Sequence, residues 1–184
     1  VGCATMASSL TMDKEKTKQI WESANLPVVP YICARKFEAE TEQGLSVLEE
    51  KSKNQFGYPV FVKPCCAGSS VGASKAANKE EFEKSVKEAF SWDDKILIEP
   101  FIKAREIECS VIGNEKQISF IPCEILPTHE FYDYEAKYKD PDGASFSIPA
   151  NLNEEQIAQV KSIAEKAYKV LDASGLSRVD FFID

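Results

Sequence analysis

Residues 58–72, with the sequence YPVFVKPCCAGSSVG, constrain the chain most, because an apolar strand runs directly into a lysine and then into a loop of small residues. Gly68 and Gly72 bracket two serines in this loop, so the backbone can approach a ligand closely and offer it several N–H groups. Lys63 stands at the mouth of the buried strand, which is an unusual place for a lysine that only solvates the surface. The stretch therefore predicts a local binding site for an anion.

The net charge indicates that such an anion is bound locally and not by a broad basic surface. The 184 residues have a formal charge of −8 at pH 7, which argues against nucleic acids and anionic membranes as partners. Because no apolar run is long enough to span a membrane, we expect a cytoplasmic protein. The apolar share of 43% is typical of a globular chain. We expect a segment of a longer protein, because the chain starts at Val1 and stops directly after an apolar run.

The six cysteines contain no CxxC pair, and His129 is the one histidine in the sequence. This composition favours reduced cysteines that pack in the core over a metal site. The adjacent Cys65 and Cys66 could form a reactive thiol pair beside the loop, but a packing role fits them better. We expect His129 to be incidental.

Hydrophobic periodicity predicts an α+β fold with two subdomains. We expect helices over residues 9–25, 44–54, 79–90 and 154–172, and strands over residues 28–33, 60–62, 95–102, 106–113, 116–122, 145–150 and 178–183. Asn78 and Glu81 predict a capped start for the third helix. Near Glu99 the pattern changes from mixed helices and strands to antiparallel-looking strands. We therefore place the subdomains at residues 1–98 and 99–184, with the functional site between them.

The segment ILIEPFI presents backbone groups directly after an apolar strand. Glu99 ends the strand, the backbone of Pro100 can accept but not donate a hydrogen bond, and that of Ile102 can do both. A flat heteroaromatic ring with a donor beside an acceptor would satisfy these groups. A strand that simply leads into a linker explains the segment equally well.

Two further segments carry candidate residues. The stretch EFYDYEAKY, residues 130–138, has four aromatic side chains among charged ones, which is typical of a loop that covers a polar ligand. In SRVDFFID, Arg178 and Asp180 lie two residues apart on a strand and share one face. They either form a salt bridge between exposed neighbours, or Arg178 stabilises a developing negative charge while Asp180 holds a divalent cation.

In chain order, ASSLTMDK, VFVKPCCAGSSVG, ILIEPFI, REIE, FYDYEAKY and SGLSRVDFF resemble the D-alanine–D-alanine ligase family of ATP-grasp enzymes. The resemblance covers essentially the whole chain, and the combination of EAKY with KPxxxGSSVG is its most specific part. It implies an α+β ATP-grasp fold in which two subdomains sandwich a nucleotide. It also implies that ATP phosphorylates one D-alanine, whose acylphosphate is attacked by the amine of a second D-alanine, for peptidoglycan synthesis. The implied cofactors are ATP and magnesium, with manganese as a substitute.

The resemblance assigns roles to residues that stand at the family's motif positions. The residues implied to bind ATP are Lys14, Lys63, Ser70, Glu99, Pro100, Ile102, Glu106 and Lys137. Among these the lysines and Ser70 would contact phosphates, Glu106 would contact the ribose, and the others would face adenine. The residues implied in catalysis are Ser69 and Tyr138, which would position the amino-acid end, and Arg178, which would stabilise the oxyanion. Asp180 would be a magnesium ligand. Without the resemblance, Lys14 would be interpreted as a solvated surface lysine.

Departures from the family pattern leave alternatives open. Family members carry a Glu and an Asn after the strand where this chain stops, and an N-terminal domain that grips the first D-alanine. Residues 1–8 would be the tail of that domain, and we expect these 184 residues alone not to catalyse. One alternative is a D-alanine–D-serine or D-alanine–D-lactate ligase of glycopeptide resistance, which the tyrosine of EAKY disfavours. The other is a nucleotide-binding module without ligase activity. The family also implies a homodimer.

Overall fold

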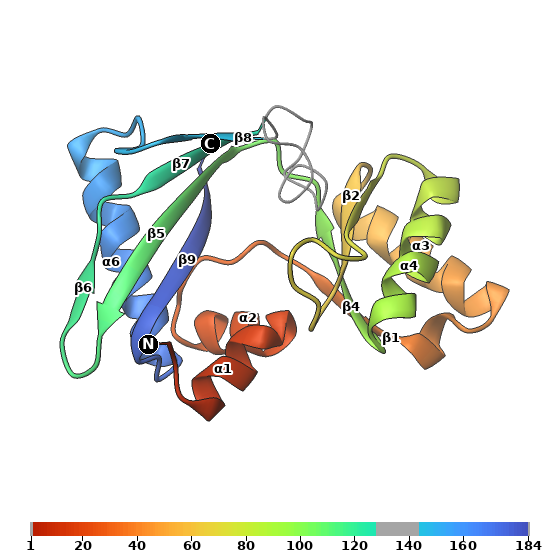
Figure 1. Cartoon of the computed structure of the whole chain (residues 1–184). Helices are drawn as coiled ribbons and strands as arrows, with labels where there is room; N and C mark the ends of the chain where they lie inside the picture. Colours follow the sequence, from red (N-terminus) through yellow and green to blue (C-terminus); the bar gives the residue numbers. More distant parts are fainter. Residues whose placement is uncertain (1, 128–143, 184) are drawn as a thin grey trace. The chain divides into compact units, whose positions relative to one another are not determined.

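The computed structural model describes residues 2–127 and 144–183, and the chain divides into two compact units (Figure 1). Unit 1 comprises Val1–Thr11, Lys16–Pro27 and Lys103–Asp184, whereas unit 2 comprises Met12–Glu15 and Val28–Ile102. Each unit has its own antiparallel sheet and its own core, which confirms the predicted α+β class.

Unit 2 is built on a four-stranded sheet with two helices against one face (Figure 1). Its strands are β1 (Ile32–Arg35), β2 (Val60–Pro64), β3 (Ser74–Ala76) and β4 (Lys95–Pro100), in the order β1-β4-β2-β3. Its helices are the 3-10 helix η1 (Lys36–Ala39), α3 (Glu42–Phe56) and α4 (Lys79–Trp92). All strand pairs in this sheet are antiparallel.

The two faces of the unit 2 sheet differ in chemistry, because side chains alternate along each strand. Val60 and Val62 of β2 point to the face that α3 and α4 cover, and they join a core with Phe82 and Val86 of α4. Their neighbours in sequence point to the opposite face, which carries Lys63, Cys65, Lys95, Leu97 and Glu99. The alternation therefore places charged side chains on the face opposite α3 and α4, where Cys65, Lys95, Leu97 and Glu99 are nevertheless buried.

The predicted start of α4 is confirmed. The side-chain oxygen of Asn78 accepts from the backbone N–H of Glu81 at 3.0 Å, and the carboxylate of Glu81 accepts from the backbone N–H of Ala77 at 2.8 Å. This reciprocal cap satisfies two donors that a helix start leaves without partners. Helix α3 also begins at a cap, where the hydroxyl of Thr41 accepts from Gly44.

Unit 1 is built on a five-stranded sheet with helix α6 packed against one face (Figure 1). Its elements are α1 (Thr5–Met12), α2 (Lys14–Ser23, whose first two residues cluster with unit 2), β5 (Arg105–Gly113), β6 (Gln117–Ser119), β7 (Cys123–Pro127), β8 (Ala144–Ser147), α6 (Glu154–Val170) and β9 (Gly175–Ile183). Strand β9 pairs with β5 along its full length. The core contains Ile107 and Val111 of β5 together with Val160 and Ala164 of α6. Tyr168 also belongs to this core, and its hydroxyl lies 2.6 Å from the carbonyl oxygen of Gly113.

The predicted elements need three corrections. The expected helix over residues 9–25 is two helices, α1 and α2, with a break at Asp13. The expected strand over residues 28–33 begins only at Ile32, because Pro30 has no N–H to donate and the ladder with β4 starts after it. Strands β3 and β7 were not predicted at all.

The contact pattern divides the chain after Ile102, close to the predicted change at Glu99, and assigns most of α1 and α2 to unit 1. The division into functional lobes at residues 98 and 99 stays a prediction. None of the helices within the described ranges is long and apolar enough to cross a membrane.

Candidate functional site

The candidate residues fall on both units, and two of them lie outside the described residues. Lys137 and Tyr138 belong to the segment 128–143, which also contains His129. Unit 2 carries Lys14, Lys63, Ser69, Ser70, Glu99, Pro100 and Ile102, whereas unit 1 carries Glu106, Arg178 and Asp180. The two groups are therefore described separately.

Lys63 and Glu99 form an ion pair on the face of the unit 2 sheet opposite α3 and α4. The ammonium of Lys63 lies 2.5 Å from Oε2 of Glu99, and their side chains are 21% and 5% exposed. The two residues come from the neighbouring strands β2 and β4, in which Phe61 lies opposite Glu99. The strand alternation that sends Val62 into the core thus turns Lys63 outward. A partly exposed ammonium at this position can approach an anionic ligand while Glu99 balances its charge.

Lys14 is not a solvated surface lysine. The interpretation that its sequence context alone suggested is therefore wrong. Its ammonium donates to the carbonyl oxygens of Cys65 at 3.2 Å and Ala67 at 2.7 Å. Burial, followed by the positive charge of Lys63, lowers the pKa of Lys14. The two ammonium groups are therefore close enough to interact, at the start of the glycine–serine loop. Two neighbouring ammonium groups can donate charge-assisted hydrogen bonds to the oxygens of a phosphate chain.

The glycine–serine loop, residues 68–72, has an unusual backbone. Ser69 and Ser70 both adopt left-handed conformations, with φ of 53° and 59°. Such conformations are strained for residues with a side chain and cluster at ligand-binding turns. Gly72, with φ of 66°, closes the loop where an added Cβ would lie 2.5 Å from Cδ1 of Trp92. The loop is thus tightly packed at its end, whereas Ser69 is exposed and Ser70 is half-buried.

The cysteines near the loop are free thiols, as the sequence predicted. A hydrogen bond to Cys33, together with burial, raises the pKa of the Cys65 thiol. Burial and the nearby carboxylate of Asp93 raise the pKa of Cys66. A raised pKa keeps a thiol protonated and weakly nucleophilic. The predicted packing role is confirmed for Cys65, which is buried, but is wrong for Cys66, which is exposed. The raised pKa values do not favour a reactive pair.

Arg178 of β9 lies between two carboxylates on the face of the unit 1 sheet that α6 leaves uncovered. Its guanidinium donates to both oxygens of Asp180, from Nε at 2.7 Å and from Nη2 at 2.9 Å. Its Nη1 lies 2.9 Å from Oε1 of Glu108, which stands opposite Asp180 on β5. We call Arg178, Asp180 and Glu108 the exposed ionic cluster. The prediction that Arg178 and Asp180 share one face is confirmed.

The exposed ionic cluster is open to ligands. The side chains of Arg178 and Asp180 are 55% and 59% exposed, so their ion pair contributes little to stability and can exchange partners. Glu106 stands two residues before Glu108 on the same face of β5, opposite Phe182. This face therefore combines one guanidinium with several carboxylates, a donor set that suits oxyanions and hard cations.

Sequence reasoning missed a buried ionic cluster in unit 2. The ammonium of Lys95 lies 2.5 Å from Oδ2 of Asp13 and 2.8 Å from Oε2 of Glu15. Burial lowers the pKa of Lys95, but the hydrogen bonds to Asp13 and Glu15 outweigh it, so this pKa is raised. We call these three residues the buried ionic cluster. The sequence indicates this cluster only through β4, where Lys95, Leu97 and Glu99 share one face and two of the three are charged.

A second ion pair that the sequence did not reveal joins β5 to β7. Nε and Nη2 of Arg105 donate to the two carboxylate oxygens of Glu124 at 2.7 Å and 2.6 Å. The hydrogen bond from Arg105 holds the pKa of Glu124 below its ordinary value, although burial acts in the opposite direction. The pair stabilises the end of the unit 1 sheet and takes no part in the predicted site.

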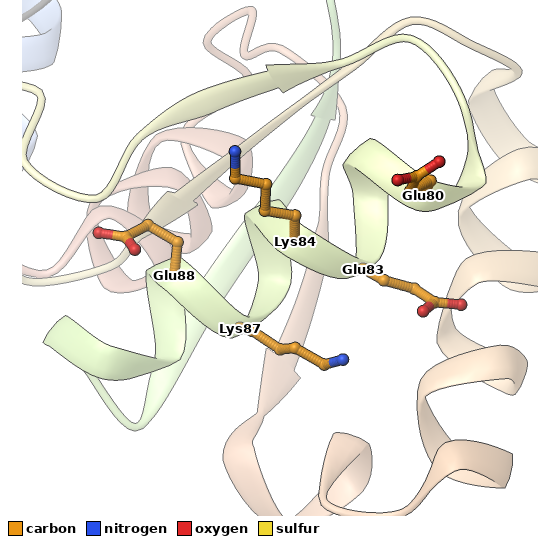
Figure 2. Close-up of a pocket in the computed structure, with 5 residues that line it drawn as sticks. All are labelled: Glu80, Glu83, Lys84, Lys87 and Glu88. Atoms are coloured by element: carbon orange, nitrogen blue, oxygen red, sulfur yellow. The ribbon is translucent and has the colours of Figure 1, made fainter.

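A surface hollow of about 480 Å³ lies along α4 and is lined by Glu80, Glu83, Lys84, Lys87 and Glu88 (Figure 2). The side chains point away from one another and not toward a common centre (Figure 2). They occupy the solvent side of α4, whose buried stripe includes Phe82 and Val86. Alternating charges at this spacing support an isolated helix, so the hollow is not a candidate site.

Comparisons with known proteins agree on one family. A family model described as "D-ala D-ala ligase C-terminus" matches residues 20–184. A D-alanine–D-alanine ligase of Treponema denticola is 52% identical over 184 residues, which cover all of this chain and 50% of the relative. A D-alanine–D-alanine ligase of Clostridium acetobutylicum is 45% identical, with coverage of 100% and 53%. The chain thus spans about half the length of these curated relatives.

Solved structures give the same result. The VanG D-Ala:D-Ser ligase from Enterococcus faecalis superposes with a TM-score of 0.85 at 32% identity, and the match covers 99% of this chain and 51% of that protein. The D-alanine-D-alanine ligase from Coxiella burnetii superposes with a TM-score of 0.79, also at 32% identity, and covers 100% and 46%. The predicted fold is confirmed by both similarities.

Proposed function

This chain belongs to the D-alanine–D-alanine ligase family, and from this premise we propose that its protein joins two D-alanines to D-alanyl-D-alanine through an acylphosphate. Enzymes of this family use ATP. The observation that carries the proposal is the position of two lysines at the entry to the glycine–serine loop. The ammonium of Lys14 donates to the carbonyl oxygens of Cys65 and Ala67, and Lys63 stands two residues before Cys65. Such a group of donors suits a triphosphate.

In unit 2, the proposed task is nucleotide binding. Lys14 and Lys63 neutralise phosphate charge, and Ser70 with the backbone of the loop closes over the phosphates. Glu99 and the backbone groups of Pro100 and Ile102 contact adenine. Ser69 positions the amino-acid end of the site, as a partner of Tyr138. The roles of Tyr138 and Lys137 remain predictions from sequence, because both residues lie outside the described ranges.

In unit 1, the proposed task is to stabilise charge at the reacting carboxylate. The guanidinium of Arg178 leaves a carboxylate partner to hold the oxyanion that develops when the amine attacks. The carboxylate of Asp180 offers the hard oxygen that magnesium prefers, and Glu106 accepts hydrogen bonds from the ribose hydroxyls. When bound, ATP supplies the transferred phosphoryl group, and magnesium supplies positive charge between the phosphates. We also propose a cytoplasmic reaction, where ATP is available.

The experiment that tests the function is a steady-state assay of the complete gene product with ATP, magnesium and D-alanine. We expect phosphate release that depends on D-alanine, together with formation of the dipeptide. A protein that binds ATP but releases no phosphate with any D-amino acid would instead be a nucleotide-binding module.

The second candidate is a D-alanine–D-serine ligase, which the similarity to the VanG enzyme favours. Against it, the relatives at 42–52% identity are named D-alanine–D-alanine ligases. The same assay with D-serine or D-lactate as the second substrate decides between them. A higher kcat/KM for D-serine than for D-alanine would replace the proposed substrate.

A further inference from the structure

The buried ionic cluster takes no part in the proposed chemistry, although its three charged side chains are largely enclosed on the face of β4 opposite α3 and α4. The Lys95 side chain is 7% exposed, and the side chains of Asp13 and Glu15 are 21% and 12% exposed. The two carboxylates precede Lys95 by 82 and 80 residues. Charges that leave water are tolerated only with good partners, so this cluster fixes residues 13–15 against the start of β4.

Lys14 lies between the two carboxylates in sequence, but it contacts residues 65–67 and not Lys95. Its backbone N–H donates to the carbonyl oxygen of Cys65 at 3.1 Å. Its ammonium donates to the same oxygen and to that of Ala67. Residues 13–15 therefore connect two parts of unit 2. The side chains of Asp13 and Glu15 contact Lys95, and Lys14 contacts residues 65–67, which precede the glycine–serine loop.

The start of the loop is also tied directly to Lys95. The backbone N–H of Cys65 donates to the carbonyl oxygen of Lys95 at 2.9 Å. The carboxylate of Asp93 accepts from the backbone N–H of Cys66 at 2.6 Å and from that of Lys95 at 3.1 Å. Residues 65–67 are thus held by the backbone of Lys95, by Asp93 and by Lys14. Beyond them begins the turn with two left-handed serines.

We propose that Lys95 is a positioning residue, which holds Asp13 and Glu15 so that Lys14 can fix the entry of the glycine–serine loop and present its ammonium to a phosphate. The part about phosphate rests on the proposed function, whereas the part about the loop stands on the contacts alone. The residue acts through Lys14 and does not itself touch the nucleotide. Without it, residues 13–15 lose the cation that both carboxylates share, and the contacts of Lys14 lose that support.

The first test is Lys95→Met, with Lys87→Met on the exposed face of α4 as the matched control. Hydrogen exchange of the chain is followed at residues 65–72, and the KM for ATP is measured in the complete gene product. We expect exchange at these residues to become about tenfold faster, because the loop opens locally. We expect the KM for ATP to rise about ten- to a hundredfold, with an unchanged KM for D-alanine. Lys87→Met should change neither.

The second test removes the risk that Lys95→Met leaves two buried carboxylates and fails to fold. The triple variant Asp13→Asn, Glu15→Gln, Lys95→Met replaces all three charges by neutral groups of similar shape, which commonly restores stability. If Lys95 positions Lys14, this variant keeps its Tm but still shows the faster exchange and the raised KM for ATP. Wild-type exchange and wild-type KM in a variant with wild-type Tm would overturn the proposal.

A third variant and the wild type separate the two proposals. Lys95→Arg keeps a cation with several donors, so it should recover most of the exchange protection. A wild-type protein without ligase activity would end the proposed function. The positioning role of Lys95 could still be tested by hydrogen exchange. Unchanged protection of residues 65–72 in Lys95→Met would contradict that role independently of the ligase activity.

Discussion

Each unit holds one cation between two carboxylates, and the two clusters differ mainly in exposure. The cation of the buried ionic cluster, Lys95, is 7% exposed, whereas that of the exposed ionic cluster, Arg178, is 55% exposed. In both, the contacts to carboxylate oxygens fall between 2.5 Å and 2.9 Å. Geometry alone therefore does not distinguish their roles.

The difference in exposure indicates which cluster can take part in a reaction. A buried cation that loses a partner leaves a charge without solvent, so Lys95 must keep its carboxylates and serves to fix the backbone. An exposed ion pair is worth only about 0–1 kcal/mol, so Arg178 can exchange a carboxylate for a ligand oxyanion at little cost. We infer that the buried cluster sets the position of the loop and that the exposed one takes part in the reaction.

The largest expected effect comes from removing each cation in turn. Lys95→Met should lower the free energy of unfolding by about 3–5 kcal/mol, because it leaves two enclosed carboxylates without their partner. Arg178→Met should lower it by less than about 1 kcal/mol. Urea unfolding of both variants and of the wild type measures the difference. Equal losses would show that exposure does not separate the two clusters.

Activity should show the opposite order. Arg178→Met should reduce kcat by about 10²–10³-fold, since a donor to the developing oxyanion is lost. Its Tm should stay close to that of the wild type. Arg178→Lys serves as the control, because it keeps the charge and loses the two-pronged hydrogen bonding. A full kcat in Arg178→Met would remove this residue from the proposed mechanism.

Features that depend on neighbours in sequence could be predicted. The cap at Asn78 follows from the spacing to Glu81, and the shared face of Arg178 and Asp180 follows from the alternation of a strand. The loop of glycines and serines could be recognised because its composition permits the left-handed turn that the structure contains. These signals lie within a few residues of one another.

The missed features depend on contacts between distant parts of the chain. Nothing near Lys95 in the sequence indicates that its partners are Asp13 and Glu15, because the fold alone brings residues 80 and more positions apart together. The break at Asp13 has the same origin, because the contacts that hold residues 13–15 come from Lys95 and Cys65, which lie far along the chain. The surface interpretation of Lys14 failed for this reason as well, because its two carbonyl partners, Cys65 and Ala67, lie more than 50 residues away, just before the loop.

The pair of Arg105 and Glu124 lies between the two clusters in exposure and sharpens the comparison. Glu124 is 7% exposed and Arg105 is 37% exposed. Glu124→Gln should lower the free energy of unfolding at pH 7 by about 1–2 kcal/mol, because an ion pair becomes a hydrogen bond between the guanidinium and a neutral amide. The size of the loss should therefore lie between those of Lys95→Met and Arg178→Met.

The pH dependence of this pair has a definite sign. The pKa of Glu124 is lowered in the folded state, mainly by the hydrogen bond from Arg105, so the unfolded state binds its proton more tightly. The contribution is complete above the ordinary carboxyl pKa of 4.5 and is lost as the pH falls through the lower folded value. When the pH is lowered from 5, the Tm of the wild type should therefore decrease more than the Tm of Glu124→Gln. Parallel curves would contradict the assignment.

The smallest effect should come from a double-mutant cycle of Arg178→Met and Asp180→Asn. Because both side chains are more than half exposed, their coupling free energy should be only about 0.2–1 kcal/mol, and 1 M salt should reduce it further by screening. A cycle of Lys95→Met and Glu15→Gln should give a larger coupling that changes less with salt, since that pair is largely buried. A salt-independent coupling of several kcal/mol at Arg178 would mean that its ion pair is fixed, and that this arginine cannot release a carboxylate to hold an oxyanion.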